Sequence, residues 1–372
     1  MEASINQTNI LLDNNTFPNH MLYKQYKNSG ISSALILPAV MMNVAGIPGI
    51  ASNMLLIFVT IQNNKLRGAA NYLLALTAFF EILHQSSHFL FFVITVSGIN
   101  FINYSTALIF QLHSIFGVTA AQTSMASTAA DRLLSVLIPL KYNKINIRLY
   151  LSIHTLLAFS SGIWMSINAI NLSNKYPTLP VTGYISDLLV LDMEIMFQFI
   201  MLLCGINVLL YLFVWIVVRW FHSTNNDGGL SSDTQSRLLK SLILIVSIVI
   251  GGFVINSICR MIINHLFNLN DIQIWSVNVF GGILLNIGAS AETPTLYIFS
   301  SFYREAINKQ LKLIFCKKKQ QKNVISVVPG LFNNSGGLVR DEGINGKTKQ
   351  LAGINKAIVL NKNNSSNIFL NK

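Results

Sequence analysis

Charge is scarce in this chain. Only 11% of its 372 residues are Asp, Glu, Lys or Arg, whereas 52% are hydrophobic, and soluble domains carry roughly 25% charged residues. The formal net charge of +12 comes from basic residues scattered over short loops and the tail. They do not form the aromatic-interleaved patch that nucleic-acid binding needs. The composition therefore predicts a membrane protein without a nucleic-acid partner.

Cysteine is also scarce. Cys204 and Cys259 lie inside apolar stretches and Cys316 lies after the last of them, so the three thiols cannot form an extracellular disulfide framework. The first 33 residues contain no apolar run, which excludes a cleavable signal peptide. We expect the first apolar stretch to insert into the membrane as its own signal.

Long apolar stretches, by contrast, are abundant, and seven can cross a hydrocarbon core of ~30 Å, which takes about 20 helical residues. They lack the strict alternation of a membrane barrel, so we expect helices. They lie near residues 35–61, 70–98, 104–138, 149–172, 187–219, 238–263 and 274–301. The sequence thus predicts an all-α membrane protein, a seven-transmembrane-helix bundle over 35–301 that follows an N-terminal tail, 1–34.

Two segments follow the last apolar stretch. In residues 302–316, Tyr303, Ile307 and Leu311 share one helical face and Arg304 and Lys312 another, which predicts a short amphipathic helix in contact with membrane lipids. Cys316 is a candidate for palmitoylation there, and an unmodified cysteine is an equally good interpretation. Residues 317–372 mix Lys, Asn, Ser and Gly without periodicity, which indicates a disordered tail.

The orientation follows from the basic residues. Lys and Arg gather in the loops after the first, third and fifth stretches and after the seventh, so those loops should face the cytoplasm and the N-terminus the outside. Asn-x-Ser/Thr sequences agree, because the glycosylation candidates Asn6, Asn14 and Asn103, and also Asn171, fall at or near the outer side. We expect a multi-pass protein of the plasma membrane with a cytoplasmic tail.

An acid and an arginine, Asp131 and Arg132, end the third stretch in the sequence DRLLSVLIPLKY. Charges at that depth are costly unless they have a function or a partner. The sequence resembles the end of the third helix in rhodopsin-like G-protein-coupled receptors. The resemblance implies that Arg132 pairs with Asp131 at rest and meets a heterotrimeric G protein on activation, with Tyr142 and Tyr211 in the same coupling region.

Other polar residues inside the stretches fit the same resemblance. Candidates for an intramembrane network are Asn53, Glu81, Glu292 and Thr293, and Pro294 and Tyr297 follow in the pattern of the receptors' seventh helix. Because low dielectric favours a neutral carboxyl, we expect Glu81 to be protonated and hydrogen-bonded to Asn53. Pro294 permits a kink where a helix must move. A static packing network is the alternative interpretation.

One branch of these receptors is the best match. Residues 71–88 (NYLLALTAFFEILHQSSH), Phe116-Gly117 to Tyr142, and Tyr303-Arg304 resemble the nematode serpentine chemoreceptors of the Srsx class over about 35–310. The resemblance implies a chemoreceptor with an unknown extracellular ligand, a small molecule or a peptide, and neither a cofactor nor enzymatic activity. The seventh stretch contains no lysine, which excludes a retinal Schiff base.

The ligand site should lie between the outer halves of the helices. Polar and aromatic residues that could line it are Gln111, His113, Ser114, Phe116, Asn168, Gln198, Asn256, Arg260, Trp275 and Asn278. Arg260 either meets an anionic ligand or extends to the lipid headgroups, and we favour the second slightly. The outer part of the third stretch has no Asp, so an amine ligand would lack its usual counter-ion.

The outer side should lack the disulfide that ties the third helix to the second outer loop in most rhodopsin-like receptors. Ala107 stands at the position of that cysteine, and residues 168–192 contain none. Packing and hydrogen bonds must therefore hold the loop at about 173–186, with Pro177 and Pro180 limiting its freedom. We expect a mobile lid.

Two other classes of protein need weighing. Glu81, His84 and His88 share one helical face at a spacing also found in di-iron sites, but the other histidines are isolated, so hydrogen bonding within the bundle is the better interpretation and no metal is expected. A secondary transporter that uses Glu81 and Glu292 is the stronger alternative. An odd number of stretches and the absence of an internal repeat argue against it.

Overall fold

A computed structural model of the chain describes residues 19–189, 195–224, 251–252, 255 and 269–313. Asn6, Asn14, Asn256, Arg260 and Cys316 lie outside the described residues, as do most of the sixth predicted stretch and the predicted tail. All described residues belong to one compact unit, Met1–Ile314.

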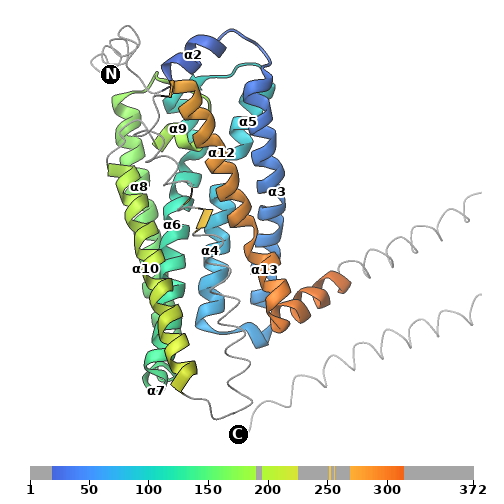
Figure 1. The fold of residues 1–372 in the computed structure, drawn as a ribbon, viewed down its shortest axis with the longest axis vertical. Coiled ribbons are helices and arrows are strands. Elements are labelled where there is room, and N and C mark those ends of the chain that lie inside the picture. The colour runs from blue at the N-terminus through green and yellow to red at the C-terminus, as the bar shows by residue number, and fades with distance from the viewer. Residues whose placement is uncertain (1–18, 190–194, 225–250, 253–254, 256–268, 314–372) are drawn as a thin grey trace, which may run out of the picture. The chain divides into compact units, whose positions relative to one another are not determined.

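The described part is a bundle of long helices, which confirms the predicted fold class (Figure 1). The predicted stretches one to five and seven appear as α3 (Ser33–Gln62), α4 (Ala69–Gln85) with α5 (His88–Val96), α6 (Tyr104–Leu137), α8 (Ile147–Lys175), α10 (Ile195–Thr224), and α12 (Asp271–Ser290) with α13 (Glu292–Phe299). Shorter elements are α2 (His20–Tyr26), η1 (Asn64–Leu66), α7 (Pro139–Tyr142), α9 (Ile185–Leu189), and the strands β1 (Ile102–Asn103) and β2 (Pro180–Val181).

Five of these spans are long and apolar enough to cross a membrane. They are Ser33–Gln62, Ala69–Val96, Ile147–Lys175, Gln198–Val217 and Asp271–Phe299. Helix α6 is less apolar, because it carries Asp131, Arg132 and many Ser, Thr and Gln residues. It packs against α4, α8 and α10, so other helices shelter its polar side chains.

Small residues let α6 approach α4 closely. A Cβ atom on Gly117 would lie 2.8 Å from the backbone oxygen of Phe80 and 2.9 Å from the backbone nitrogen of His84. Such a contact is too short for any side chain, so only glycine permits this approach of the two backbones. The second predicted stretch thereby comes to lie directly against α6, with Glu81 and His84 buried between helices.

The seventh span is broken where the sequence suggested a kink. Helix α12 ends at Ser290 and α13 begins at Glu292. Pro294 cannot donate a backbone hydrogen bond, and its ring clashes with the carbonyl four residues earlier, which belongs to Ser290. The kink therefore follows from Pro294.

The segment after α13 is helical over residues 301–313. Tyr303, Ala306 and Ile307 are buried against the Leu56 and Val59 side of α3, whereas Arg304 and Lys312 are exposed. The predicted amphipathic character is therefore present, and the apolar face packs on protein.

The fifth span begins later than the sequence predicted. The prediction placed its start at 187, but residues 185–189 form α9, and α10 starts at Ile195. The prediction included this segment because Ile185 and Leu188 are apolar. Both residues belong to the separate helix α9 and are buried in the core cluster.

Candidate functional site

We call the end of the bundle where α6 carries Asp131 and Arg132 the Arg132 end, and the end with β1, β2 and α9 the Tyr184 end. At the Arg132 end, Asp131 is fully buried and accepts a hydrogen bond from the Tyr142 hydroxyl at 2.8 Å. Burial raises the pKa of Tyr142 above its usual range, and the neighbouring Asp131 adds to the shift. The phenol therefore stays protonated and keeps donating.

The expected ion pair between Asp131 and Arg132 is not formed. Among the described residues, the ion pairs are Lys65–Glu305 and Glu81–His84. Successive residues of a helix point about 100° apart, so Asp131 turns to α7 while Arg132 faces another way. Arg132 is half-buried, and its Nε has no hydrogen-bond partner within the described ranges.

Two hydrogen bonds join α10 to α6 within ten residues of Arg132 along α6. The Tyr211 hydroxyl donates to the backbone oxygen of Met125 at 3.1 Å, and Asn207 Nδ2 donates to that of Gln122 at 3.0 Å. Both side chains are buried. The Tyr211 hydroxyl thus bonds to the backbone of α6, and its place in a coupling region stays a prediction.

Sequence reasoning missed two residues of this region. The rings of Tyr150 and His154 lie 4.5 Å apart on α8, and Tyr150 lies 6.4 Å from the ring of Tyr142. The hydroxyl of Tyr150 interacts with the Asp131 carboxyl, and Nδ1 of His154 has no hydrogen-bond partner among the described residues. Their spacing of four residues, one helical turn, was the available signal.

The intramembrane network differs from the expectation at Glu81. Its Oε2 lies 3.1 Å from His84 Nδ1, and the expected hydrogen bond to Asn53 is absent. Both amide atoms of Asn53 are buried without a partner in the part of the chain that the structure describes. His84 is one turn from Glu81 on the same helix, so it reaches the carboxylate without a change in helix packing.

The second histidine links α5 to α12. His88 Nε2 lies 2.7 Å from Asn286 Oδ1, and Asn286 Nδ2 donates to the backbone oxygen of Gly282. The Asn286 amide therefore offers its oxygen to His88, which requires a hydrogen on Nε2. Both histidines thus bond within the bundle, as interpreted, and the described residues hold no group of three metal-ligating side chains.

The predicted residues of the seventh span all lie in α13, just after the kink. Glu292 is buried, and Thr293 donates to the backbone oxygen of Ser52 on α3 at 2.9 Å. Tyr297 is partly exposed and donates to Asn308 at 3.1 Å, while Pro294 is exposed. The kinked helix is therefore joined to α3 by two hydrogen bonds, from Ser290 to the Ala45 oxygen and from Thr293 to the Ser52 oxygen, and the Tyr297 hydroxyl joins it to the 301–313 helix.

The ligand candidates do not form one group. Phe116 packs between Phe80 and Phe159, with ring centroids 5.8 and 5.4 Å away. Asn168 donates to the backbone of its own helix. His113 lies 2.7 Å from Ser86 and 3.1 Å from Ser114. Gln198 is exposed.

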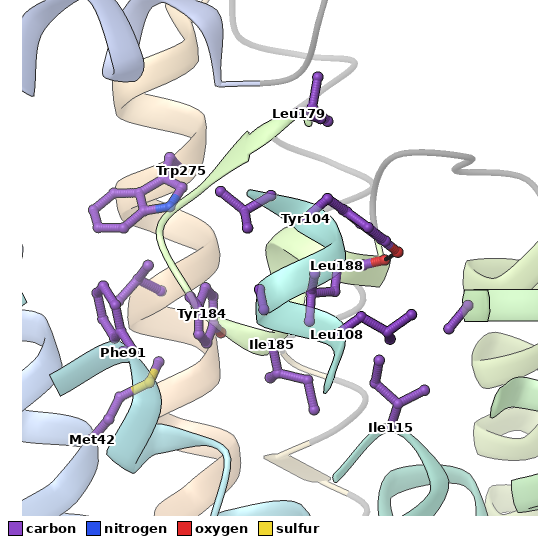
Figure 2. Close-up of a cluster of buried hydrophobic side chains, with 14 of the residues drawn as sticks. Met42, Phe91, Tyr104, Leu108, Ile115, Leu179, Tyr184, Ile185, Leu188 and Trp275 are labelled. Carbon is purple, nitrogen blue, oxygen red and sulfur yellow. Dashed lines mark hydrogen bonds between the residues drawn. The ribbon is translucent and has the colours of Figure 1, made fainter. Parts of the chain in front are cut away.

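The remaining candidates, Gln111, Trp275 and Asn278, all contact the loop between α8 and α10 or lie in its buried cluster. Gln111 Nε2 donates to the backbone oxygen of Gly183, and Asn278 offers its backbone oxygen to the Tyr184 hydroxyl at 3.3 Å. Trp275 lies in the same buried cluster as Tyr184 (Figure 2). These three are the candidates that the structure brings together.

Strand pairing, packing and hydrogen bonds hold the loop, and the mobile lid expected from the sequence stays a prediction. β1 and β2 are antiparallel, with Ile102 opposite Val181. Asp187 accepts hydrogen bonds from the backbone and hydroxyl of Thr182 at 3.1 and 2.5 Å and from Asn19 at 3.2 Å. These contacts hold the loop without a disulfide.

A surface pocket of about 400 Å³ opens at the Arg132 end, between α4 and α8. Tyr72, Leu76 and Leu151 line it with Arg148. None of the predicted ligand residues contributes to it, so it is separate from the expected ligand site.

Comparison with known families identifies a family that matches most of the chain. Residues 47–311 match the family described as serpentine type 7TM GPCR chemoreceptor Srsx. The match covers 265 of 372 residues, from within α3 to the helix after α13. A comparison with curated proteins gives no match.

Proposed function

Because the chain belongs to the Srsx family of serpentine seven-transmembrane GPCR chemoreceptors, we propose that it senses a small molecule or peptide outside the cell and activates a heterotrimeric G protein inside. The match over residues 47–311 carries this conclusion. It spans both the Tyr184 end, where a ligand would enter, and the Arg132 end, where the G protein would bind.

The G protein would meet Arg132. Asp131 and Arg132 form no ion pair among the described residues, so the carboxylate does not hold the guanidinium of Arg132 in place. Arginine presents a planar fork of donors that suits backbone oxygens and carboxylates of a partner. An arginine with an unpaired Nε in the described part of the chain is therefore suited to bind such groups.

The signal would pass through the buried polar residues between the two ends. Glu81 contacts His84 within α4, His88 links α5 to Asn286 on α12, and Thr293 links α13 to α3. Each link is one or two hydrogen bonds, and the span breaks between α12 and α13. A small displacement of α12 at the Tyr184 end would therefore change contacts on both sides of the kink.

The receptor would lie in the plasma membrane with its N-terminus outside. Lys65, Arg67, Lys141 and Arg148 are exposed at the Arg132 end, as the positive-inside rule requires of a cytoplasmic face. Asn103 is exposed in β1 at the opposite end, where an oligosaccharide could be attached.

A transporter remains the second candidate, because Glu81 and Glu292 are both buried. The discriminating experiment is a compound screen on cells that express the full chain, with nucleotide exchange on a G protein and cation flux measured in parallel. We expect exchange without flux. Flux driven by a compound, without any exchange on the G proteins tested, would favour the transporter.

A further inference from the structure

The second outer loop occupies the space where an outer ligand would bind. Leu179 and Leu188 are fully buried, and Tyr184 is 4% exposed. Figure 2 shows Tyr184 and Ile185 among Phe91, Met42, Leu108 and Ile115, which come from α5, α3 and α6. Side chains of the loop thus fill the region between helices.

Aromatic rings and a backbone oxygen surround the Tyr184 side chain. It lies 5.8 Å from the ring of Phe91, and Phe91 lies 6.1 Å from that of Trp275. Both separations are typical of favourable aromatic pairs. The hydroxyl donates to the Asn278 backbone oxygen at 3.3 Å.

Gly282 on α12 makes room for that hydroxyl. A Cβ atom at Gly282 would overlap the Tyr184 oxygen and would lie 2.9 Å from the terminal methyl of Met42. Shape, aromatic walls and a backbone acceptor together form a subsite that accepts a phenol ring. The residues that surround the ring, Phe91, Met42, Gly282 and Asn278, carry no charge.

Two buried polar atoms beside the loop lack partners. Gln111 is fully buried and its Nε2 donates to Gly183, but its Oε1 has no hydrogen-bond partner among the described residues. Trp275 is 3% exposed, and its Nε1 likewise has none there. Buried polar groups normally have partners, so an unpaired acceptor and an unpaired donor point to a polar molecule that binds here.

We propose that Tyr184 fills one subsite of the receptor's own ligand site, and that the external ligand takes its place. The ligand would be a neutral molecule with an aromatic ring, a hydrogen-bond donor on that ring directed at the Asn278 oxygen, and a polar group that pairs with Gln111 or Trp275. This inference rests on the proposed receptor function and specifies the chemistry of its site.

The first test removes the Tyr184 ring from the subsite. The full chain is purified in lipid nanodiscs as wild type and as Tyr184→Ala, and thermal unfolding is measured with and without 4-methylphenol or toluene. We expect Tyr184→Ala to lower the Tm by roughly 5 °C or more. 4-Methylphenol should restore part of the loss, toluene less, and neither should stabilise the wild type, whose subsite is full.

Equal stabilisation of wild type and Tyr184→Ala by 4-methylphenol would overturn the proposal, because it would indicate binding elsewhere. An unchanged Tm in Tyr184→Ala, or no rescue of a folded variant, would also overturn it. These measurements need no G protein, so their failure is distinct from a failure of the proposed function.

A second test holds even where Tyr184→Ala does not fold. Gly282→Ala should lower the Tm of the wild type, because the new methyl meets the Tyr184 hydroxyl. The same change should cost much less in a Tyr184→Phe background, where that oxygen is gone. Gly205→Ala is the matched control, since its Cβ would meet nothing within 4 Å. An equal loss in both backgrounds would contradict the placement of Tyr184.

Discussion

Asp131 has no exposed surface, so the stability of its carboxylate depends on its neighbours. The carboxylate accepts a hydrogen bond from Tyr142, eleven residues along the chain on α7. A buried carboxylate that loses a donor is penalised by the cost of its desolvation. The hydrogen bond from Tyr142 therefore stabilises this end of the bundle.

Tyr142→Phe should destabilise the receptor by about 1.5–3 kcal/mol, the range for a hydrogen bond to a charged group. Thermal unfolding of the purified variant measures the loss. Tyr297→Phe is a matched control, because its hydroxyl also donates to a side chain, Asn308, but at an exposed site. Equal losses in the two variants would refute a special role for Tyr142.

Glu81→Gln tests whether the charge of the buried carboxyl matters. Glutamine keeps the shape and can still bond to His84, which lies 3.1 Å from the carboxylate. We expect normal surface expression and preserved signalling for Glu81→Gln, and a loss of expression for Glu81→Ala, which leaves a cavity and removes the carboxylate that His84 contacts. Abolished signalling in Glu81→Gln at normal surface level would show that the charge is required.

At the scale of elements, the conformation of the loop between α8 and α10 depends on Gly183. Gly183 has a φ of +79°, in the left-handed region that side chains disfavour. A Cβ atom there would also collide with the end of Ile94 on α5. The turn that carries Tyr184 into the bundle therefore favours glycine because of its φ, and the end of the Ile94 side chain would have to move to admit a Cβ atom.

Gly183→Ala should lower the Tm more than Gly30→Ala does. Gly30 has a similar φ of +62°, but a Cβ there meets nothing within 4 Å. The backbone strain is thus common to both variants, and the difference reports the contact with Ile94. Equal shifts in thermal unfolding would mean that the loop does not pack against α5.

At the scale of the whole molecule, the orientation in the membrane can be tested directly. Epitope tags at the two termini should give opposite results in antibody staining of intact cells. We expect the N-terminal tag to be stained without permeabilisation and the C-terminal tag only after it, because the basic loops lie at the Arg132 end. Staining of the C-terminal tag in intact cells would exclude the seven-span orientation.

The helices could be predicted because lipid leaves an apolar stretch of about 20 residues few alternatives. Pro294 likewise predicted the break after Ser290. The loop could not be predicted, since β1 and β2 contribute two residues each and pair across the chain at Ile102 and Val181. No local pattern indicates that pairing.

The candidate site could likewise be predicted only in part. Motif residues such as Asp131 and Arg132 could be found, because a charge inside an apolar stretch is rare. Their partners could not: Asp131 bonds to Tyr142 and Glu81 to His84. Such choices depend on the direction in which each side chain leaves its helix, which an apolar pattern does not specify.

The most direct test of the receptor function is nucleotide exchange on a purified heterotrimeric G protein, driven by the full chain in nanodiscs with the compounds found by screening. We compare the wild type with Arg132→Ala and with Arg67→Ala, which removes an exposed arginine at the same end. The account predicts compound-dependent exchange for the wild type and for Arg67→Ala, and little or none for Arg132→Ala at an unchanged Tm. Undiminished exchange with Arg132→Ala would contradict it.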